Sequence, residues 1–164
     1  MKKLSLLFLA GLIWSCSQQT SKQQSANLSN DEILAQLKFI KEKYRPGLGE
    51  IMSGVQMHHA KLWFAVLNEN WKLADYEIKE IKERFQQAAD LETDRKEAGN
   101  IPMIYNNVDS VLYTIQQKDI VAFKSSFQSL TNACNNCHRT VNFGFNVVMI
   151  PTSLPVTNQD FKAQ

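Results

Sequence analysis

One helical stripe near the C-terminal end constrains the fold more than any other feature of this chain. Within residues 120–140, apolar or cysteine side chains recur at steps of four, three, four and three: Phe123, Phe127, Leu130, Cys134 and Cys137. This spacing places all of them on one face of an α-helix. Such a face has to be buried against partner elements, so the stripe predicts packed helices whose core extends as far as both cysteines.

The two cysteines also belong to the motif Cys134-Asn135-Asn136-Cys137-His138. Two cysteines separated by two residues and followed by histidine are typical of covalent haem attachment, in which each thiol forms a thioether and the histidine ligates the iron. The alternatives are a dithiol redox pair, a local disulfide and half of a zinc site. A redox pair is expected near a βαβ pattern, a zinc site needs further ligands, and the sequence offers neither context. The motif therefore predicts one covalent haem c, held by Cys134, Cys137 and His138.

The N-terminal residues have the pattern of an exported lipoprotein. Lys2 and Lys3 precede an apolar run, residues 4–14, which is too short to span a membrane and ends at Ser15-Cys16. We expect residues 1–15 to be a lipoprotein signal peptide and Cys16 to be lipidated; an ordinary secretory peptide with an incidental cysteine is the alternative. Residues 16–30 are polar and rich in Ser and Gln, which predicts a disordered tether. Either interpretation predicts export, and lipidation predicts anchoring to a membrane in the periplasm or cell envelope.

Charge and composition limit the classes of partner. The chain has 18 basic and 16 acidic residues, and removal of residues 1–15 takes away two lysines and no acid, which leaves 16 of each. No basic stripe survives, so we do not expect nucleic-acid binding. No acid pair or nucleophile–base arrangement stands out, so we do not expect an enzyme. Redox proteins of the cell envelope are the expected partners, and an oligomer is possible on this composition.

Residues 31–164 predict one all-α domain, because helical periodicity recurs along most of it. Ser29 to Glu32 offers helix-capping side chains for a first helix that ends near Tyr44, before Pro46. Four further helices are expected over about 48–67, from 71 onward, from about 102 to 118, and over 120–140. The mostly polar stretch Thr93–Asn100 is expected to separate the second and third of these four, with Gly99 as the point where helical geometry ends and Pro102 in the first turn of the third.

The four later helices predict an antiparallel four-helix bundle, with an extra N-terminal helix packed outside it and an extended C-terminal tail. Their predicted core positions are Met52, Val55, His59, Leu62 and Val66; Trp71, Ala74, Ile78, Ile81, Phe85 and Ala88; Ile104, Val108, Val111, Leu112 and Ile115; and the stripe of residues 120–140. In the tail, Phe143, Phe145, Val147 and Met149 alternate, which predicts an extended segment that buries this set and wraps over the haem end. Pro151 and Pro155 exclude helix there.

Antiparallel packing also selects a second iron ligand. The C-terminal end of the 120–140 helix should lie beside the N-terminal end of the 48–67 helix. Met52 is in the first turns of that helix, whereas His59 is ~10 Å further along its axis. We therefore expect Met52 opposite His138, with His59 or no sixth ligand as alternatives. Met57 and His58 lie off the stripe and are expected at the surface.

The position of the motif at the end of a last helix resembles the cytochrome c′ family of antiparallel four-helix bundles. This resemblance covers roughly residues 48–142. The chain is also similar to a family of small exported bacterial cytochromes, through Pro46–Met52, His59–Ala65, the cysteine motif, Pro151-Thr152, Pro155 and Asn158-Gln159. The latter resemblance implies haem and export and implies no particular reaction.

Three functions follow from these patterns. The first is an exported mono-haem cytochrome that transfers electrons, with His138 and Met52 as axial ligands. The second, which the cytochrome c′ resemblance implies, is NO or CO binding or sensing at an open axial position. The third is a haem-free helical lipoprotein that acts as an interaction module and in which the cysteine pair is structural.

Overall fold

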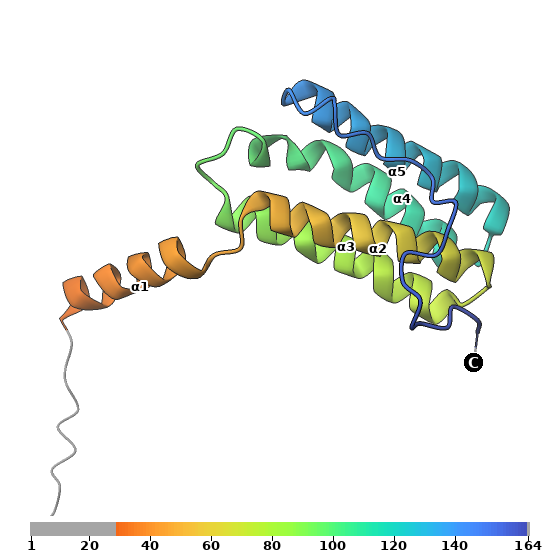
Figure 1. The fold of residues 1–164 in the computed structure, drawn as a ribbon, viewed down its shortest axis with the longest axis horizontal. Helices are drawn as coiled ribbons and strands as arrows, with labels where there is room; N and C mark the ends of the chain where they lie inside the picture. The colour runs from red at the N-terminus through yellow and green to blue at the C-terminus, as the bar shows by residue number, and fades with distance from the viewer. Residues whose placement is uncertain (1–28, 164) are drawn as a thin grey trace, which may run out of the picture. The chain divides into compact units, whose positions relative to one another are not determined.

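A computed structural model of the protein describes residues 29–163 (Figure 1). The predicted signal peptide, the lipidation site Cys16 and most of the predicted tether lie outside the described residues. The chain divides into two compact units, residues 1–39 and 40–164, and each is described by itself. Residues 29–163 form five α-helices and one 3₁₀-helix and contain no strand, which confirms the all-α prediction. None of the described helices is long and apolar enough to cross a membrane.

Helix α1 (Asn30–Tyr44) begins at the predicted cap. The Glu32 amide donates to Ser29 Oγ (3.2 Å), and the Ser29 amide donates to Glu32 Oε2 (2.8 Å), which forms a reciprocal capping box. These bonds to Ser29 also lower the pKa of the Glu32 carboxyl. The helix contains no buried residue. Its stability as a helix therefore rests on capping and local propensity, and its packing outside the other helices stays a prediction.

Helices α2 (Leu48–Leu67) and α3 (Trp71–Leu91) lie side by side and are joined by the turn 68–70 (Figure 1). Asn70 caps α3 as predicted, because its side-chain oxygen accepts from the Leu73 amide at 3.1 Å. The predicted stripes of both helices are buried, except that Met52 and Trp71 are only partly buried. The apolar faces of the two helices therefore meet in one core.

The connection after α3 differs from the prediction. Helix α3 ends at Leu91, well before Gly99, and both Gly99 and Pro102 lie inside the 3₁₀-helix η1 (Ala98–Ile104), which leads into α4 (Tyr105–Gln116). A 3₁₀-helix has three residues per turn, so positions three apart share a face. The residues that η1 buries, Ala98, Ile101 and Ile104, have that spacing. Pro102 therefore lies in a 3₁₀-helix and not in the first turn of the expected α-helix, which begins at Tyr105.

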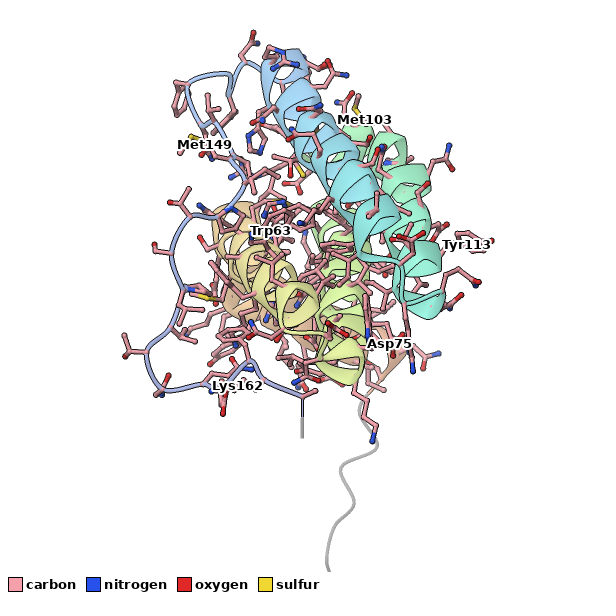
Figure 2. All side chains as sticks on the ribbon, turned by 90° about the vertical axis from the view of Figure 1, so that its right-hand side faces the viewer. Trp63, Asp75, Met103, Tyr113, Met149 and Lys162 are labelled. Atoms are coloured by element: carbon pink, nitrogen blue, oxygen red, sulfur yellow. The ribbon has the colours of Figure 1, made fainter. Side chains whose placement is uncertain are left out.

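Helix α5 (Ile120–Thr140) matches the prediction at its start and along its buried face. Asp119 accepts from the Ala122 amide at 2.9 Å and so caps the helix. All members of the predicted stripe are buried. Trp63 of α2 packs against Phe123 and Phe127, with ring centroids 6.0 and 5.1 Å apart, and Figure 2 shows Trp63 between the helices. The stripe therefore forms part of the common core.

The tail, residues 141–163, contains no helix and runs back from the end of α5 past the other helices (Figure 1). At its far end the buried Phe161 ring packs 6.0 Å from the Phe64 ring, and Asn70 Nδ2 donates to the Lys162 carbonyl at 3.0 Å. These contacts hold the end of the tail against the last turn of α2 and the turn that joins α2 to α3.

The prediction of which tail side chains are buried is wrong. Phe143, Phe145, Val147 and Met149 are between 43% and 81% exposed, and Met149 is labelled on the tail in Figure 2. The intervening Val148 and Ile150 pack against the core instead. In an extended segment, a shift of one residue exchanges the two faces, and alternation alone cannot fix which face is buried.

Candidate functional site

An apolar cavity of ≈ 220 Å³ lies where the end of α5 meets the start of α2. The first turns of α2 contribute Leu48, Gly49 and Met52 to its wall, and the last turns of α5 contribute Cys134, Cys137 and His138. The ends of the two helices that were expected to be neighbours thus line the same space. The structure brings both cysteines, His138, Met52 and also His59 to one cavity.

The other walls come from α3, the loop after it, η1 and the tail, and of these the sequence had assigned only the tail to this end of the helices. They are Ile81 and Phe85 of α3, Arg95 and Glu97 of the following loop, Ile101 and Ile104 of η1, and Val141, Phe143, Asn146 and Val148 of the tail. Ile81 and Phe85 were on a predicted core stripe, so their burial could be foreseen. The tail was expected at this end of the helices, although not with this face, whereas the contribution of η1 could not be foreseen because a short irregular segment has no long periodicity from which to predict a face.

The two thiols line the cavity from within the core. Cys134 is 9% exposed and Cys137 is 8% exposed, and both are free. Burial raises the pKa of the Cys134 thiol to about 12 and also raises the pKa of Cys137. Both groups are therefore neutral thiols near pH 7 and lack the lowered pKa of a reactive redox cysteine.

His138 is held in one tautomer by the tail. Its Nδ1 lies 2.6 Å from the carbonyl oxygen of Asn146. A carbonyl oxygen can only accept, so Nδ1 carries the proton and donates it. In the neutral ring, Nε2 then has the free lone pair that a metal ligand needs. A histidine that ligates a metal commonly makes this kind of hydrogen bond with its other nitrogen.

Asn135, inside the cysteine motif, ties the same part of the tail to α5. Its Nδ2 donates to the Val148 carbonyl, and its Oδ1 accepts from the Val148 amide, both at 2.8 Å. The amide of Phe143 also donates to the His138 carbonyl at 2.7 Å. The last turns of α5 therefore organise the tail that closes one side of the cavity.

His59 is a buried, neutral histidine on the cavity wall. The Thr131 hydroxyl donates to the Phe127 carbonyl (2.9 Å), so its oxygen accepts from His59 Nε2 (2.9 Å). The His59 ring also stacks on Phe127, with centroids 4.2 Å apart. Burial lowers its pKa from 6.5 to about 4. Met52, by contrast, is partly buried on the same wall; which residue lies opposite His138 stays a prediction.

The prediction that His58 lies at the surface is wrong, whereas Met57 is exposed as predicted. The His58 side chain is 12% exposed, and its Nδ1 lies 2.6 Å from Oε2 of Glu77, a residue of α3 that is itself 1% exposed. The helical stripe missed this contact because it lies between α2 and α3, away from the cavity. In the sequence, the available signal was Glu77 itself, an acid directly before Ile78 of the predicted core stripe of α3.

Comparison with known proteins found no matching family, no similar curated protein and no similar solved structure. Among residues 29–163, no group of three or more His, Cys, Asp or Glu side chains is arranged to hold a metal ion. The functional interpretation therefore depends on the chemistry of the cavity residues.

Proposed function

We propose that this chain is an exported, lipid-anchored c-type cytochrome that carries one covalent haem and transfers electrons. One observation supports this more than any other: both cysteine thiols and His138 line one apolar cavity, and His138 donates its Nδ1 proton to the Asn146 carbonyl. That hydrogen bond leaves Nε2 available as an axial ligand. The lipid anchor at Cys16 follows from the sequence pattern and is part of the proposal.

The residues present fit a covalent haem group. Cys134 and Cys137 lie one turn apart on the same face of α5 and would form its two thioethers. His138 follows directly and would be the proximal ligand. The mostly apolar lining lowers the polarity around the site, which favours a redox centre whose potential the protein sets. When bound, haem would supply the one-electron couple, and these side chains would hold and orient it.

Met52 is the proposed second axial ligand. It comes from the start of α2 and shares the cavity with His138, whereas His59 Nε2 is already committed to Thr131. A thioether opposite a histidine raises the reduction potential, which suits electron transfer. The proposal includes an antiparallel four-helix bundle of α2, α3, α4 and α5 of the cytochrome c′ type, and the pairing of α2 with α3 and of α4 with α5 supports it.

Binding of NO or CO at an open axial position is the second candidate. The observation that favours it is the character of the α2 wall, where Val55 and the neutral His59 accompany a Met52 that is only partly buried. An apolar wall of this kind suits a small neutral ligand. Redox partner proteins in the cell envelope belong to the first proposal only.

Spectroscopy of the purified protein separates these proposals. The chain is produced in a host that attaches haem c, and oxidised and reduced spectra are recorded with and without CO. Covalent haem that is lost in a Cys134→Ala, Cys137→Ala double variant supports the cytochrome. Absence of covalent haem refutes both haem proposals and leaves the haem-free interaction module. A high-spin ferrous spectrum that changes promptly with CO favours gas binding.

The axial ligand has its own test. Met52→Ala should abolish the methionine–iron charge-transfer band of the oxidised protein, because the thioether is lost. Met57→Ala is the matched control, since Met57 is on the same helix and is exposed. Persistence of the band in Met52→Ala would assign the ligand to another residue.

A further inference from the structure

The residue between the two cysteines makes a contact that the haem motif itself does not require. Asn135 makes a paired hydrogen bond with the backbone of Val148, one as donor and one as acceptor, each 2.8 Å long. Close by along the tail, the Asn146 carbonyl accepts from His138 Nδ1 at 2.6 Å. One side chain of α5 thus holds the tail segment whose carbonyl contacts the neighbouring histidine.

The acceptor for His138 is a backbone carbonyl, so its position depends on whatever fixes residues 146–148. Val148 and Ile150 pack against the core on the inner side of this segment, whereas Phe145, 81% exposed, and Val147, 64% exposed, add little packing on its outer side. The paired amide bond from Asn135 comes from the interior of an α-helix, whose backbone is fixed by its own hydrogen bonds. The far anchors of the tail, at Phe161 and Lys162, are too remote in sequence to set the position of a single carbonyl.

We propose that Asn135 is a positioning residue for His138. By fixing Val148 it holds the Asn146 carbonyl against Nδ1, which selects the tautomer with Nε2 free and makes the imidazole a stronger electron donor. The role of His138 as an iron ligand rests on the function proposed above. The hydrogen-bonded chain from Asn135 to the tail to His138 is independent of it.

Three variants of the full chain test this. Asn135→Ala removes both bonds to Val148. Asn135→Asp keeps the acceptor for the Val148 amide and loses the donor. Asn136→Ala is the matched control, because Asn136 lies in the same motif, is exposed, and makes no side-chain hydrogen bond to the described residues.

Two measurements apply to each variant. NMR of the nitrogen-labelled histidine side chain reports the His138 tautomer and the exchange of its Nδ1 proton, and cleavage by chymotrypsin at Phe143 and Phe145 reports release of the tail. In Asn135→Ala we expect a mixture of tautomers and cleavage faster by on the order of tenfold. Asn135→Asp should be intermediate, and Asn136→Ala should match the wild type.

The reduction potential of the haem-loaded protein is the third readout, and a purely structural role would not shift it in this graded order. Loss of the bond to Nδ1 weakens donation to the iron, so the potential should rise in Asn135→Ala and less in Asn135→Asp. If haem is attached and the potential and tautomer of Asn135→Ala equal those of Asn136→Ala, the positioning role is refuted while the cytochrome proposal stands. If no haem is attached, the cytochrome proposal fails, and NMR and cleavage still decide whether Asn135 positions His138. Should Asn135→Ala not fold, Asn135→Asp gives the same decision.

Discussion

The protein should lose stability in mild acid because of His59. Burial lowers the pKa of His59 from 6.5 to about 4. Between these two values the unfolded chain binds a proton that the folded chain does not. The contribution of the neutral ring to stability is therefore complete above pH 6.5 and is lost as the pH falls toward 4. The expected loss relative to pH 7 is about 2 kcal/mol at pH 5 and about 3 kcal/mol at pH 4.

The measurement is urea unfolding followed by circular dichroism, for the wild type and for His59→Phe, between pH 4 and 7. Phenylalanine can keep the stacking on Phe127 and does not titrate, so subtraction of the two pH profiles removes the contribution of the carboxylates and of His58. As the pH is lowered from 7, the free energy of unfolding of the wild type should fall further than that of His59→Phe, by about 2 kcal/mol at pH 5 and about 3 kcal/mol at pH 4. His59→Gln serves as a second variant that can still donate to Thr131. Parallel profiles for wild type and both variants would refute the assignment of a lowered pKa to His59.

Two further predictions concern the contact between α2 and α3. His58→Ala should reduce the free energy of unfolding by about 1–3 kcal/mol, because it leaves the buried Oε2 atom of Glu77 without its only hydrogen-bond partner among the described residues. Lys82→Ala, which breaks an exposed ion pair, should cost less than about 1 kcal/mol in the same urea assay. Gly54→Ala should destabilise by less than about 1 kcal/mol despite the better helix propensity of alanine, because its Cβ would lie 2.5 Å from Arg84 Nε and the Arg84 side chain would have to move away. The same substitution in an Arg84→Ala background should instead be neutral or stabilising, and an equal cost in both backgrounds would contradict a clash with Arg84.

Periodicity predicted most of the helices, because a helix with one buried face repeats its apolar residues at a fixed interval. The bounds of α2 and the caps at Asn70 and Asp119 agree with the prediction, since both depend on side chains near in sequence. The 3₁₀-helix around Pro102 was not predicted, because a proline is tolerated in the first turn of an α-helix and its presence alone does not distinguish the two helix types. Which face of the tail is buried was not predicted either, because it depends on the hydrogen bonds between Val148 and Asn135, a residue of α5.

The candidate site divides in the same way. Sequence alone selected Cys134, Cys137 and His138, since their order and spacing are local and chemically specific. The sequence also placed Met52 near the start of its helix, at the end that lines the same cavity as His138, because the length and direction of a helix determine how far along it a residue lies. Only the tertiary structure paired His138 with the carbonyl of Asn146 and His59 with Thr131. Hydrogen bonds across the fold depend on which backbone and side-chain atoms packing brings within reach, and no interval along a chain encodes that.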